Sequence, residues 1–415
     1  MGKLYYLDNN ATTQVDPEVF KAMAPYYMEN FGNPSGVYSF AQKAKQDVEA
    51  ARAQVAEFLN AAPSEIIFTS GGTEADNLAI KGAAHALKEK GRHIITTAIE
   101  HHAVLNTCEF LGKNGWEITY LPVDEYGLVN PEILKAAIRK DTVIISIMYA
   151  NNEIGTIEPI KELADIAREA KVYFHTDAVQ VAGKIKLDVK ELGVDMLSLS
   201  GHKIYGPKGI GVLYLKKGTR LSAMMHGGHH ENNRRAGTEN VPAIIGLGKA
   251  CELAKKALEE GVEEKRIKGL RDRLEKELLG KVTEVVVNGH PVKRLDNTLN
   301  IIFKYIEGEG ILIHMDFEGI CASSGSACTS GSLDPSHVLL AIGLPHEIAH
   351  SSIRFSFGRF STEADVDKVM EVLPPAVEKL RMLSPFWHNR DEMLKKDGAC
   401  YTDEHGHHGH EKDEE

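Results

Sequence analysis

Cysteine is scarce in this chain, with five residues in 415 and no CxxC pair. An odd number of widely spaced cysteines argues against a disulfide framework and fits a reducing cytoplasm. No apolar run approaches the roughly 20 residues that a membrane-spanning helix needs, and the N-terminus lacks the apolar region of a secretory signal. The formal net charge of −11 argues against nucleic acid as the main partner. We therefore expect a cytoplasmic protein with neither a membrane nor a nucleic-acid partner.

Short apolar runs recur along the first half of the chain, and segments of helical periodicity separate most of them. Nearly all-apolar strands that alternate with helices favour a mostly parallel sheet covered on both faces. Ligands of such sheets bind beyond the carboxyl ends of the strands, so the polar residues there are candidates for a site. The runs that we predict as strands are 66–68, 93–97, 118–123, 143–149, 172–177, 195–200 and 209–215.

The rest of the chain predicts a second, smaller domain. Residues 241–279 are helical in pattern and rich in Lys and Glu, and we expect them to link the two domains. Shorter strands follow, and Thr362 and Asp365 have capping-box spacing at the start of a closing helix over 362–382. The N-terminal strand is compatible with either domain. We expect a large domain over 16–255, a small α+β domain made of 1–15 and 256–385, and a disordered tail over 386–415.

The segment SLSGHKIYGPKG, residues 198–209, places Lys203 directly after a strand-like run. Desolvation lowers the pKa of a lysine amine and makes it a nucleophile towards carbonyls. We interpret Lys203 as a Schiff-base lysine. Taken alone, a surface lysine at the start of a loop is the better explanation, so this interpretation depends on the rest of the chain.

Other strand ends also carry polar groups. The turn Ser70–Thr73 either offers backbone N–H groups to a phosphate or is an ordinary turn capped by Thr73. Asp177 either pairs with a protonated pyridine nitrogen or caps a helix, and Gln180 follows three residues later. Asn151 and Asn152 supply amide donors or form a turn. One of His101 and His102 could stack on an aromatic ring or move protons, or simply be hydrogen-bonded.

The segment CASSGSACTSGSL, residues 321–333, is dominated by small polar residues, and we expect it to be mobile and exposed. Cys328 lies in its middle, where packing does not account for a cysteine, so we interpret it as a nucleophilic thiolate. Cys321, at the border of the segment, is expected to be structural. Cys108 and Cys251 fall in helical patterns and are expected in the core.

Arg354, on a predicted strand of the small domain, is a candidate to clamp a substrate carboxylate, with a surface salt bridge as the alternative. Arg359 is a weaker candidate for the same role. The tail contains Cys400 and four histidines that could bind a divalent metal, although their spacing fits no fixed zinc site and we favour a solvated tail. These histidines are His405, His407, His408 and His410.

Together, these features meet the needs of pyridoxal phosphate: a lysine, an acid for the ring nitrogen, a phosphate cradle and a donor to the ring oxygen. The chain resembles the NifS/IscS-type cysteine desulfurases of group I, within the class V aminotransferase-like enzymes, over roughly residues 4–382. The motifs that carry the resemblance are YLDNNATT, FTSGGTEADNLAIKG, EHHAVL, ANNEIGT, HTDAVQ, SLSGHKIYGPKG, RRAGTEN, SSGSACTSG and SIRFSFGRF.

The resemblance implies the aspartate-aminotransferase-like fold of type I, with a mostly parallel seven-stranded sheet in the large domain and a smaller α+β domain. It implies a homodimer that uses pyridoxal 5'-phosphate to convert L-cysteine to L-alanine. The sulfur would leave as a persulfide on Cys328 for an iron–sulfur scaffold protein of the IscU/NifU type, and Cys328 would contact the cluster transiently.

The same resemblance implies roles for single residues. Lys203 would bind the cofactor covalently, Asp177 would pair with its ring nitrogen, and His101 would stack on the ring and move protons. Gln180 and Asn152 would serve the ring oxygen and the substrate, while Arg354 would hold the substrate carboxylate. The phosphate would be bound by Gly72, Thr73, Ser200, Gly201 and His202, with Thr238 reaching it from the neighbouring subunit.

Three alternatives stay open at this point. A selenocysteine lyase would use the same pocket, and another class V aminotransferase-like enzyme would share the cofactor residues but would not need Cys328. A metal-binding carrier would instead use the histidine-rich tail. Cys321 stands where the family usually has a small or apolar residue, so an internal disulfide with Cys328 is conceivable under oxidation.

Overall fold

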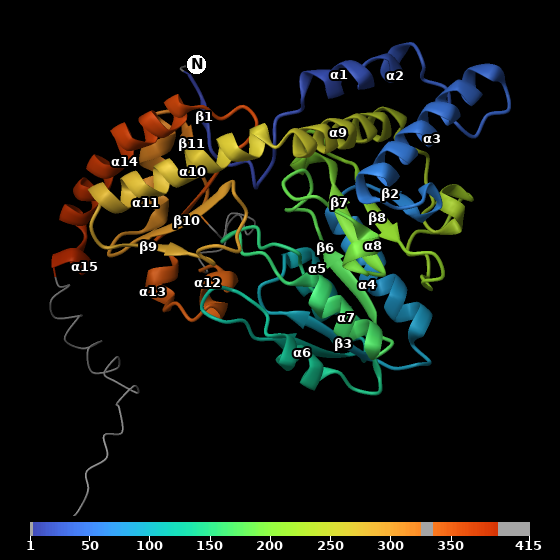
Figure 1. The fold of residues 1–415 in the computed structure, drawn as a ribbon, viewed down its shortest axis with the longest axis horizontal. Coiled ribbons are helices and arrows are strands. Elements are labelled where there is room, and N and C mark those ends of the chain that lie inside the picture. The colour runs from blue at the N-terminus through green and yellow to red at the C-terminus, as the bar shows by residue number, and fades with distance from the viewer. Residues whose placement is uncertain (1–2, 325–334, 389–415) are drawn as a thin grey trace, which may run out of the picture.

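The computed structural model describes residues 3–324 and 335–388 and has an α/β architecture of two lobes (Figure 1). The larger lobe contains a seven-stranded sheet of order β2-β8-β7-β6-β5-β3-β4. Strands β3 to β7 pair in parallel, whereas β8 is antiparallel to both of its neighbours. The expectation of a mostly parallel sheet of seven strands is confirmed. Its strands are β2 (Ile66–Thr69), β3 (His93–Thr97), β4 (Glu117–Leu121), β5 (Thr142–Ser146), β6 (Tyr173–Asp177), β7 (Met196–Ser200) and β8 (Gly211–Leu215).

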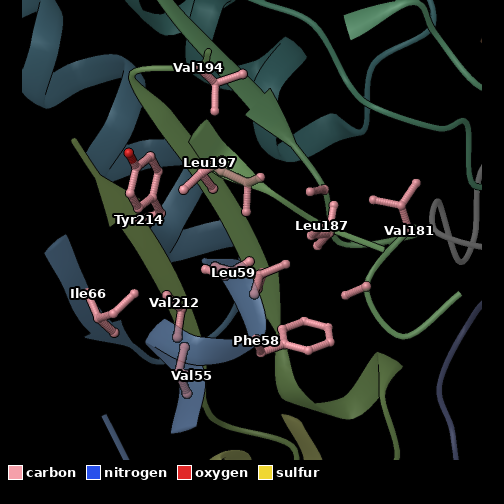
Figure 2. Close-up of a cluster of buried hydrophobic side chains, with 14 of the residues drawn as sticks. Val55, Phe58, Leu59, Ile66, Val181, Leu187, Val194, Leu197, Val212 and Tyr214 are labelled. Atoms are coloured by element: carbon pink, nitrogen blue, oxygen red, sulfur yellow. The ribbon is translucent and has the colours of Figure 1, made fainter. Parts of the chain in front are cut away.

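Helices cover both faces of this sheet. Because successive side chains of a strand point to opposite faces, Val212 and Tyr214 of β8 join one core while Leu213 between them joins the other. Val55 and Leu59 of α3 pack in the first core (Figure 2). Burial on both faces accounts for the nearly continuous apolar strands of the sequence. The helices of this lobe are α1 (Pro17–Met23), α2 (Pro25–Met28), α3 (Ser39–Leu59), α4 (Gly72–Leu87), α5 (His102–Lys113), α6 (Pro131–Ala137), α7 (Ile160–Glu169), α8 (Val189–Leu192) and α9 (Val241–Glu260).

The smaller lobe has its own core, to which α10, β10 and α14 contribute. Its antiparallel sheet has the order β12-β10-β9, and the predicted capping box of Thr362 and Asp365 is present at the start of α14. Strand β1 (Tyr5–Tyr6) pairs in parallel with β11 (Ile320–Cys321), so the N-terminal strand packs with this lobe. The other elements are β9 (Val285–Asn288), β10 (Thr298–Phe303), β12 (Ser352–Ser356), α10 (Val262–Lys281), α11 (Gly308–Phe317), α12 (His337–Ala341), α13 (His346–Ala349), α14 (Glu363–Leu383) and α15 (Pro385–His388).

The helical stretch between the lobes consists of two helices. Gly261 separates α9 from α10 and adopts a left-handed φ of 63°, which glycine tolerates because it has no Cβ. Helix α9 packs against α3 in the large lobe, whereas Leu270 and Leu274 of α10 belong to the core of the small lobe. Within residues 3–324 and 335–388, no helix is long and apolar enough to cross a membrane.

Candidate active site

The candidate site lies at the carboxyl edge of the large sheet, and the phosphate turn and Lys203 meet there. Thr69 at the end of β2 and Ser200 at the end of β7 both stand opposite Gly211 of β8. A Cβ on Gly211 would lie 2.5 Å from the carbonyl carbon of Gly71, so the turn can approach β8 this closely only because residue 211 is glycine. Lys203 ends the short 3₁₀ helix η2 (Gly201–Lys203) that directly follows β7.

The turn after β2 presents the free N-terminus of helix α4. The helix begins at Gly72, inside the predicted turn Ser70–Thr73, and no side chain caps it. The alternative that Thr73 caps the turn is therefore wrong. A Cβ on Gly72 would lie 3.6 Å from the Ser200 Cβ, so these two predicted phosphate ligands are neighbours. Uncapped N–H groups at a helix start fit a phosphate.

Asp177 ends β6 and is 6% exposed. Its Oδ1 accepts a hydrogen bond from the Val179 N–H at 2.9 Å, and no described helix begins beside it, so the helix-cap alternative is wrong. Burial raises the pKa of Asp177 to about 6, although the Val179 bond and the charge of Lys203 oppose this rise. A buried carboxylate of this kind is stabilised by a cationic partner. The protonated ring nitrogen of pyridoxal phosphate fits this need.

A buried polar network that the sequence analysis missed lies near Asp177. The His175 ring bonds the hydroxyls of Ser146 at 2.8 Å and Ser198 at 2.9 Å, and burial lowers its pKa to about 3. Asp76 of α4 lies 3.6 Å from this ring, and burial together with the charge of Asp177 raises the pKa of Asp76. Both shifts favour neutral side chains beside Asp177, so this carboxyl carries the local negative charge.

His101 is the N-cap of α5, and its position is consistent with a neutral ring. The Nδ1 atom accepts a hydrogen bond from the Ala103 N–H at 3.1 Å, so in the neutral form the ring hydrogen is on Nε2. Burial, together with the positive charge of Lys203, lowers the pKa of His101 to about 4. His101 near neutral pH therefore offers an N–H donor and an uncharged ring face.

The other residues predicted to bind the cofactor differ in their exposure and in their hydrogen-bond partners. His202 bonds the Thr12 hydroxyl through Nδ1 at 3.1 Å, and burial with Lys203 nearby lowers its pKa to about 4. Gln180 donates to the carbonyl oxygen of Asn10 at 3.0 Å. Thr73 and Thr238 are exposed, and Thr238 lies between η3 (His230–Asn233) and α9.

Asn151 and Asn152 have different surroundings. The Asn151 side chain accepts hydrogen bonds from the N–H groups of Glu153 and Ile154 at 2.8 and 3.0 Å, which is the turn alternative of the sequence analysis. Asn152 is half-buried, and its carbonyl oxygen accepts a hydrogen bond from Arg354 at 3.0 Å. The structure thus leaves Asn152 as the residue of this pair beside the site.

Arg354 on β12 is 2% exposed, so the alternative of a surface salt bridge is wrong. Its Nη2 donates to Asp8 Oδ1 at 2.8 Å, while its Nε has no hydrogen-bond partner among the described residues. Arg359 is bound elsewhere: it donates to Asp16 at 2.7 Å and to Glu263 at 2.9 Å. The weaker prediction that Arg359 also holds a carboxylate substrate is not supported by these contacts.

Cys328, Cys400 and the tail histidines lie outside the described residues. The flanks of the segment that carries Cys328 are described, and both contact the site. Ser323 pairs with Arg354 through two backbone hydrogen bonds of 2.6 and 3.2 Å, and the Ser336 hydroxyl donates to Glu153 at 2.5 Å. The described residues on either side of that segment therefore lie at or next to the candidate site.

The other cysteines differ in exposure. Cys108 and Cys251 are fully buried, as expected. Cys321 on β11 is partly exposed, and burial together with Asp316 and Asp8 raises its pKa. A raised pKa keeps the thiol protonated and unreactive, which is consistent with the structural role expected for Cys321.

Comparison with known proteins decides between the enzyme classes that share such a site. The model of the family described as "Aminotransferase class-V" matches residues 5–369. The chain belongs to this family. Its curated relatives include "Cysteine desulfurase IscS" of Methanosarcina thermophila, which is 56% identical over 383 residues, or 92% of this chain and 94% of the relative. The protein of the same name from Clostridium botulinum (strain Hall) is 53% identical over 399 residues, or 96% of this chain and 100% of the relative.

Solved structures agree with these matches. A "NIFS-LIKE PROTEIN" superposes with a TM-score of 0.85 at 37% identity and covers 92% of this chain and 100% of its own. "SspA in complex with cysteine" gives a TM-score of 0.76 at 38% identity and covers 86% of this chain and 100% of its own. The expected fold, the pyridoxal phosphate cofactor and the cysteine desulfurase class of this family member are therefore confirmed.

Proposed function

We propose that this class-V enzyme removes sulfur from L-cysteine and passes it, as a persulfide on Cys328, to an iron–sulfur scaffold protein. The observation that carries the proposal is the convergence of Lys203, buried Asp177 and the uncapped start of α4 at one sheet edge, with the flanks of the Cys328 segment beside them. When bound there, pyridoxal phosphate withdraws electrons from the substrate carbon atoms.

The residues around the cofactor then have separate roles. The turn at Gly72 and Ser200 would hold the phosphate, Asp177 would keep the ring nitrogen protonated, and His101 would lie against the ring with a hydrogen on Nε2 to donate. Lys203 would hold the cofactor, and its free amine would accept the α-proton of the substrate. Its Nζ donates to the Ala11 carbonyl at 2.7 Å, which fixes the amine at the strand end.

Sulfur transfer requires a second nucleophile, and we assign this step to Cys328. Its thiolate attacks the sulfur of the bound cysteine, an S–S bond forms as the Cβ–S bond breaks, and the released electron pair takes up a proton at Cβ. Alanine is the product, and the persulfide remains on Cys328 until an acceptor thiol takes the terminal sulfur. Arg354 orients the substrate by its carboxylate during this step.

The proposal is tested by recording the absorbance of the bound cofactor before and after addition of L-cysteine, together with alanine and sulfide release under a reductant. Lys203→Ala is expected to abolish turnover. Cys328→Ala is expected to retain the cofactor and its spectral response to cysteine but to form no persulfide. The matched control is Cys321→Ala, which is expected to turn over normally. Normal persulfide formation and alanine release by Cys328→Ala would refute the assignment of Cys328.

We also propose that the enzyme is a homodimer. Large apolar side chains are exposed along residues 20–40 of the large lobe, and Val37 is 94% and Met28 83% exposed. Thr238 is exposed as well, as a residue that reaches the phosphate of a second subunit must be. Mass measurement by light scattering is expected to give twice the chain mass, and Met28→Asp with Val37→Asp is expected to give monomers with little activity. A wild-type monomer with full activity would refute the proposal.

The division of the chain and its location are part of the same proposal. We propose two domains, 16–255 and 1–15 with 256–385, and a cytoplasmic enzyme, because the separate cores and the free thiols fit these assignments. Limited proteolysis is expected to remove residues 386–415 first and to leave desulfurase activity intact. Loss of sulfide release with retained cofactor on that deletion would show that the histidine-rich tail takes part in the reaction.

A further inference from the structure

Asn10, in the polar turn after β1, connects the candidate site to both lobes. The residue is 1% exposed, and each of its polar groups has a partner. Its carbonyl oxygen accepts from Gln180 Nε2 at 3.0 Å and from Lys203 Nζ. Its side-chain Nδ2 donates to the Asn152 carbonyl at 3.2 Å and to the Thr298 hydroxyl at 2.9 Å. A displacement of Asn10 as a whole therefore affects Lys203 and Gln180 through its backbone carbonyl and Asn152 through its side chain.

Lys184 helps to orient the amides of Asn10 and Gln180. Its Nζ donates to Asn10 Oδ1 at 3.3 Å and to Gln180 Oε1 at 3.2 Å. Asn297 Nδ2 also donates to Asn10 Oδ1, at 3.0 Å. An ammonium group has donors only, so both amide oxygens must face Lys184 and both NH₂ groups must face away from it. For Gln180, this leaves the NH₂ group on the side of the Asn10 carbonyl and Lys203. One hydrogen of that group bonds Asn10, and the other is available to a ligand.

The surroundings of Lys184 are unusual for a lysine. Its two hydrogen-bond partners are neutral amides rather than carboxylates, and the positive charges of Lys203 and Arg354 are close enough to act on it. The residue lines a cavity of about 310 Å³ between the lobes, and Lys203 lines the same cavity. Burial, with these charges, lowers the pKa of Lys184 to about 7. The charged residues that line the cavity opposite it are Glu263, Glu264, Lys268, Arg294, Asp296 and Arg359.

Lys184 is partly buried, and a lysine in such surroundings normally has a carboxylate partner, whereas the two partners of its ammonium are amide oxygens. We propose that Lys184 is a positioning residue that fixes the Gln180 amide with its NH₂ group towards the cofactor ring oxygen. The inference rests on the proposed function, in which Gln180 serves that oxygen. Without Lys184, the Gln180 amide keeps its bond from Nε2 to the Asn10 carbonyl but loses the donor to its Oε1, so its NH₂ group is held less firmly towards the cofactor ring oxygen.

The experiment is a pH titration of the absorbance of the bound cofactor without substrate. A hydrogen bond to the ring oxygen stabilises its ionised form, so loss of the bond makes the cofactor chromophore hold its proton to higher pH. In Lys184→Met we expect the titration midpoint to rise by about 0.7 pH unit, which is about fivefold in the dissociation constant for a typical hydrogen bond. Lys184→Arg restores donors and charge, and its midpoint is expected near that of the wild type.

Two controls separate positioning from a structural role. Lys186 is exposed two residues later, and Lys186→Met is expected to leave the midpoint unchanged. In a Gln180→Ala background, Lys184→Met is expected to produce no further shift, because the amide that it orients is gone. If Lys184→Met does not fold, the same pH titration is made with Lys184→Gln.

The outcomes are distinct. An unchanged midpoint in Lys184→Met, or an equal shift with and without Gln180, overturns the proposal. If instead Lys203→Ala retains full turnover, the proposed function fails whatever Lys184 does.

Discussion

Gly211 offers a direct test of how the phosphate turn is built. This residue starts β8, which lies between β2 and β7, and the turn after β2 passes over it. A Cβ at this position would lie 2.5 and 2.6 Å from two backbone atoms of Gly71 and 2.7 Å from the Leu199 carbonyl oxygen. The overlapping atoms belong to the backbone of two neighbouring segments, so no side-chain rotation can relieve the overlap. Gly211→Ala must push the phosphate turn away from the sheet.

The size of the effect follows from two opposing terms. Replacing glycine by alanine stabilises a chain by roughly 0.4–1 kcal/mol through the unfolded state where the new side chain fits. Overpacking of a closed site costs about 1–3 kcal/mol, and the contacts at Gly211 are all with backbone. We therefore expect Gly211→Ala to lower the free energy of unfolding by about 1–2 kcal/mol and to weaken pyridoxal phosphate binding more than binding of pyridoxal, which has no phosphate.

The assay is urea unfolding of the cofactor-free protein, with titrations of pyridoxal phosphate and pyridoxal. Gly269 in α10 is the matched control, because it is exposed and a Cβ there meets no atom within 4 Å. Gly269→Ala is expected to raise the free energy of unfolding by up to about 1 kcal/mol, as in other helix interiors. The reasoning is refuted if Gly211→Ala unfolds at the same urea concentration as the wild type and binds pyridoxal phosphate equally well.

Three further predictions concern charge. Burial raises the pKa of Glu158 to about 8, so the folded state binds an extra proton between about pH 4.5 and 8. The free energy of unfolding therefore declines as the pH rises through this range. Glu158→Gln is expected to make this decline, measured by urea unfolding, less steep, and an unchanged slope would contradict the reasoning. Arg354→Lys is expected to raise the KM for cysteine about tenfold or more, since a fork to a carboxylate is lost, whereas Arg359→Lys is expected to lower stability with little change in KM; equal KM values for both would contradict the carboxylate role. The pKa of His101 is lowered to about 4, so His101 does not titrate between pH 5 and 8. The pH profile of kcat/KM is therefore expected to have the same shape in His101→Gln as in the wild type over this range. A pH-dependent change in the wild-type profile that is absent from the variant would show that His101 does titrate there.

The sequence predicted the large sheet well because its strands are buried on both faces, which leaves a local signal in runs such as 143–149. The residues at strand ends were also recognisable, since Asp177 and Lys203 follow such runs directly. Element boundaries were less certain: the start of α4 at Gly72 depends on backbone geometry that glycine pairs do not specify.

Lys184 and Asn10 could not be found in this way. Asn10 looks like a turn residue, and its partners lie 142 to 346 positions away in the chain. Lys184 follows Gln180 by one helical turn in spacing, but the cavity that it lines is formed together with residues far away in the chain, such as Arg294 and Phe357. Ordinary residue types acquire these roles from long-range contacts, which local pattern does not contain.

The ion pair between Asp8 and Arg354 explains how a carboxylate site can be kept at the junction of the lobes. The Arg354 side chain is 3% exposed and that of Asp8 is 19% exposed, so before substrate binds the guanidinium would be a costly unpaired charge without Asp8. In the proposed function, a substrate carboxylate would supply the same negative charge as Asp8. The backbone of Arg354 also pairs with Ser323, which lies at the start of the segment that carries Cys328. Under the proposed function, binding of the amino-acid carboxylate and placement of the sulfur acceptor would therefore both depend on one strand, β12, and on the turn after β1 that contacts it.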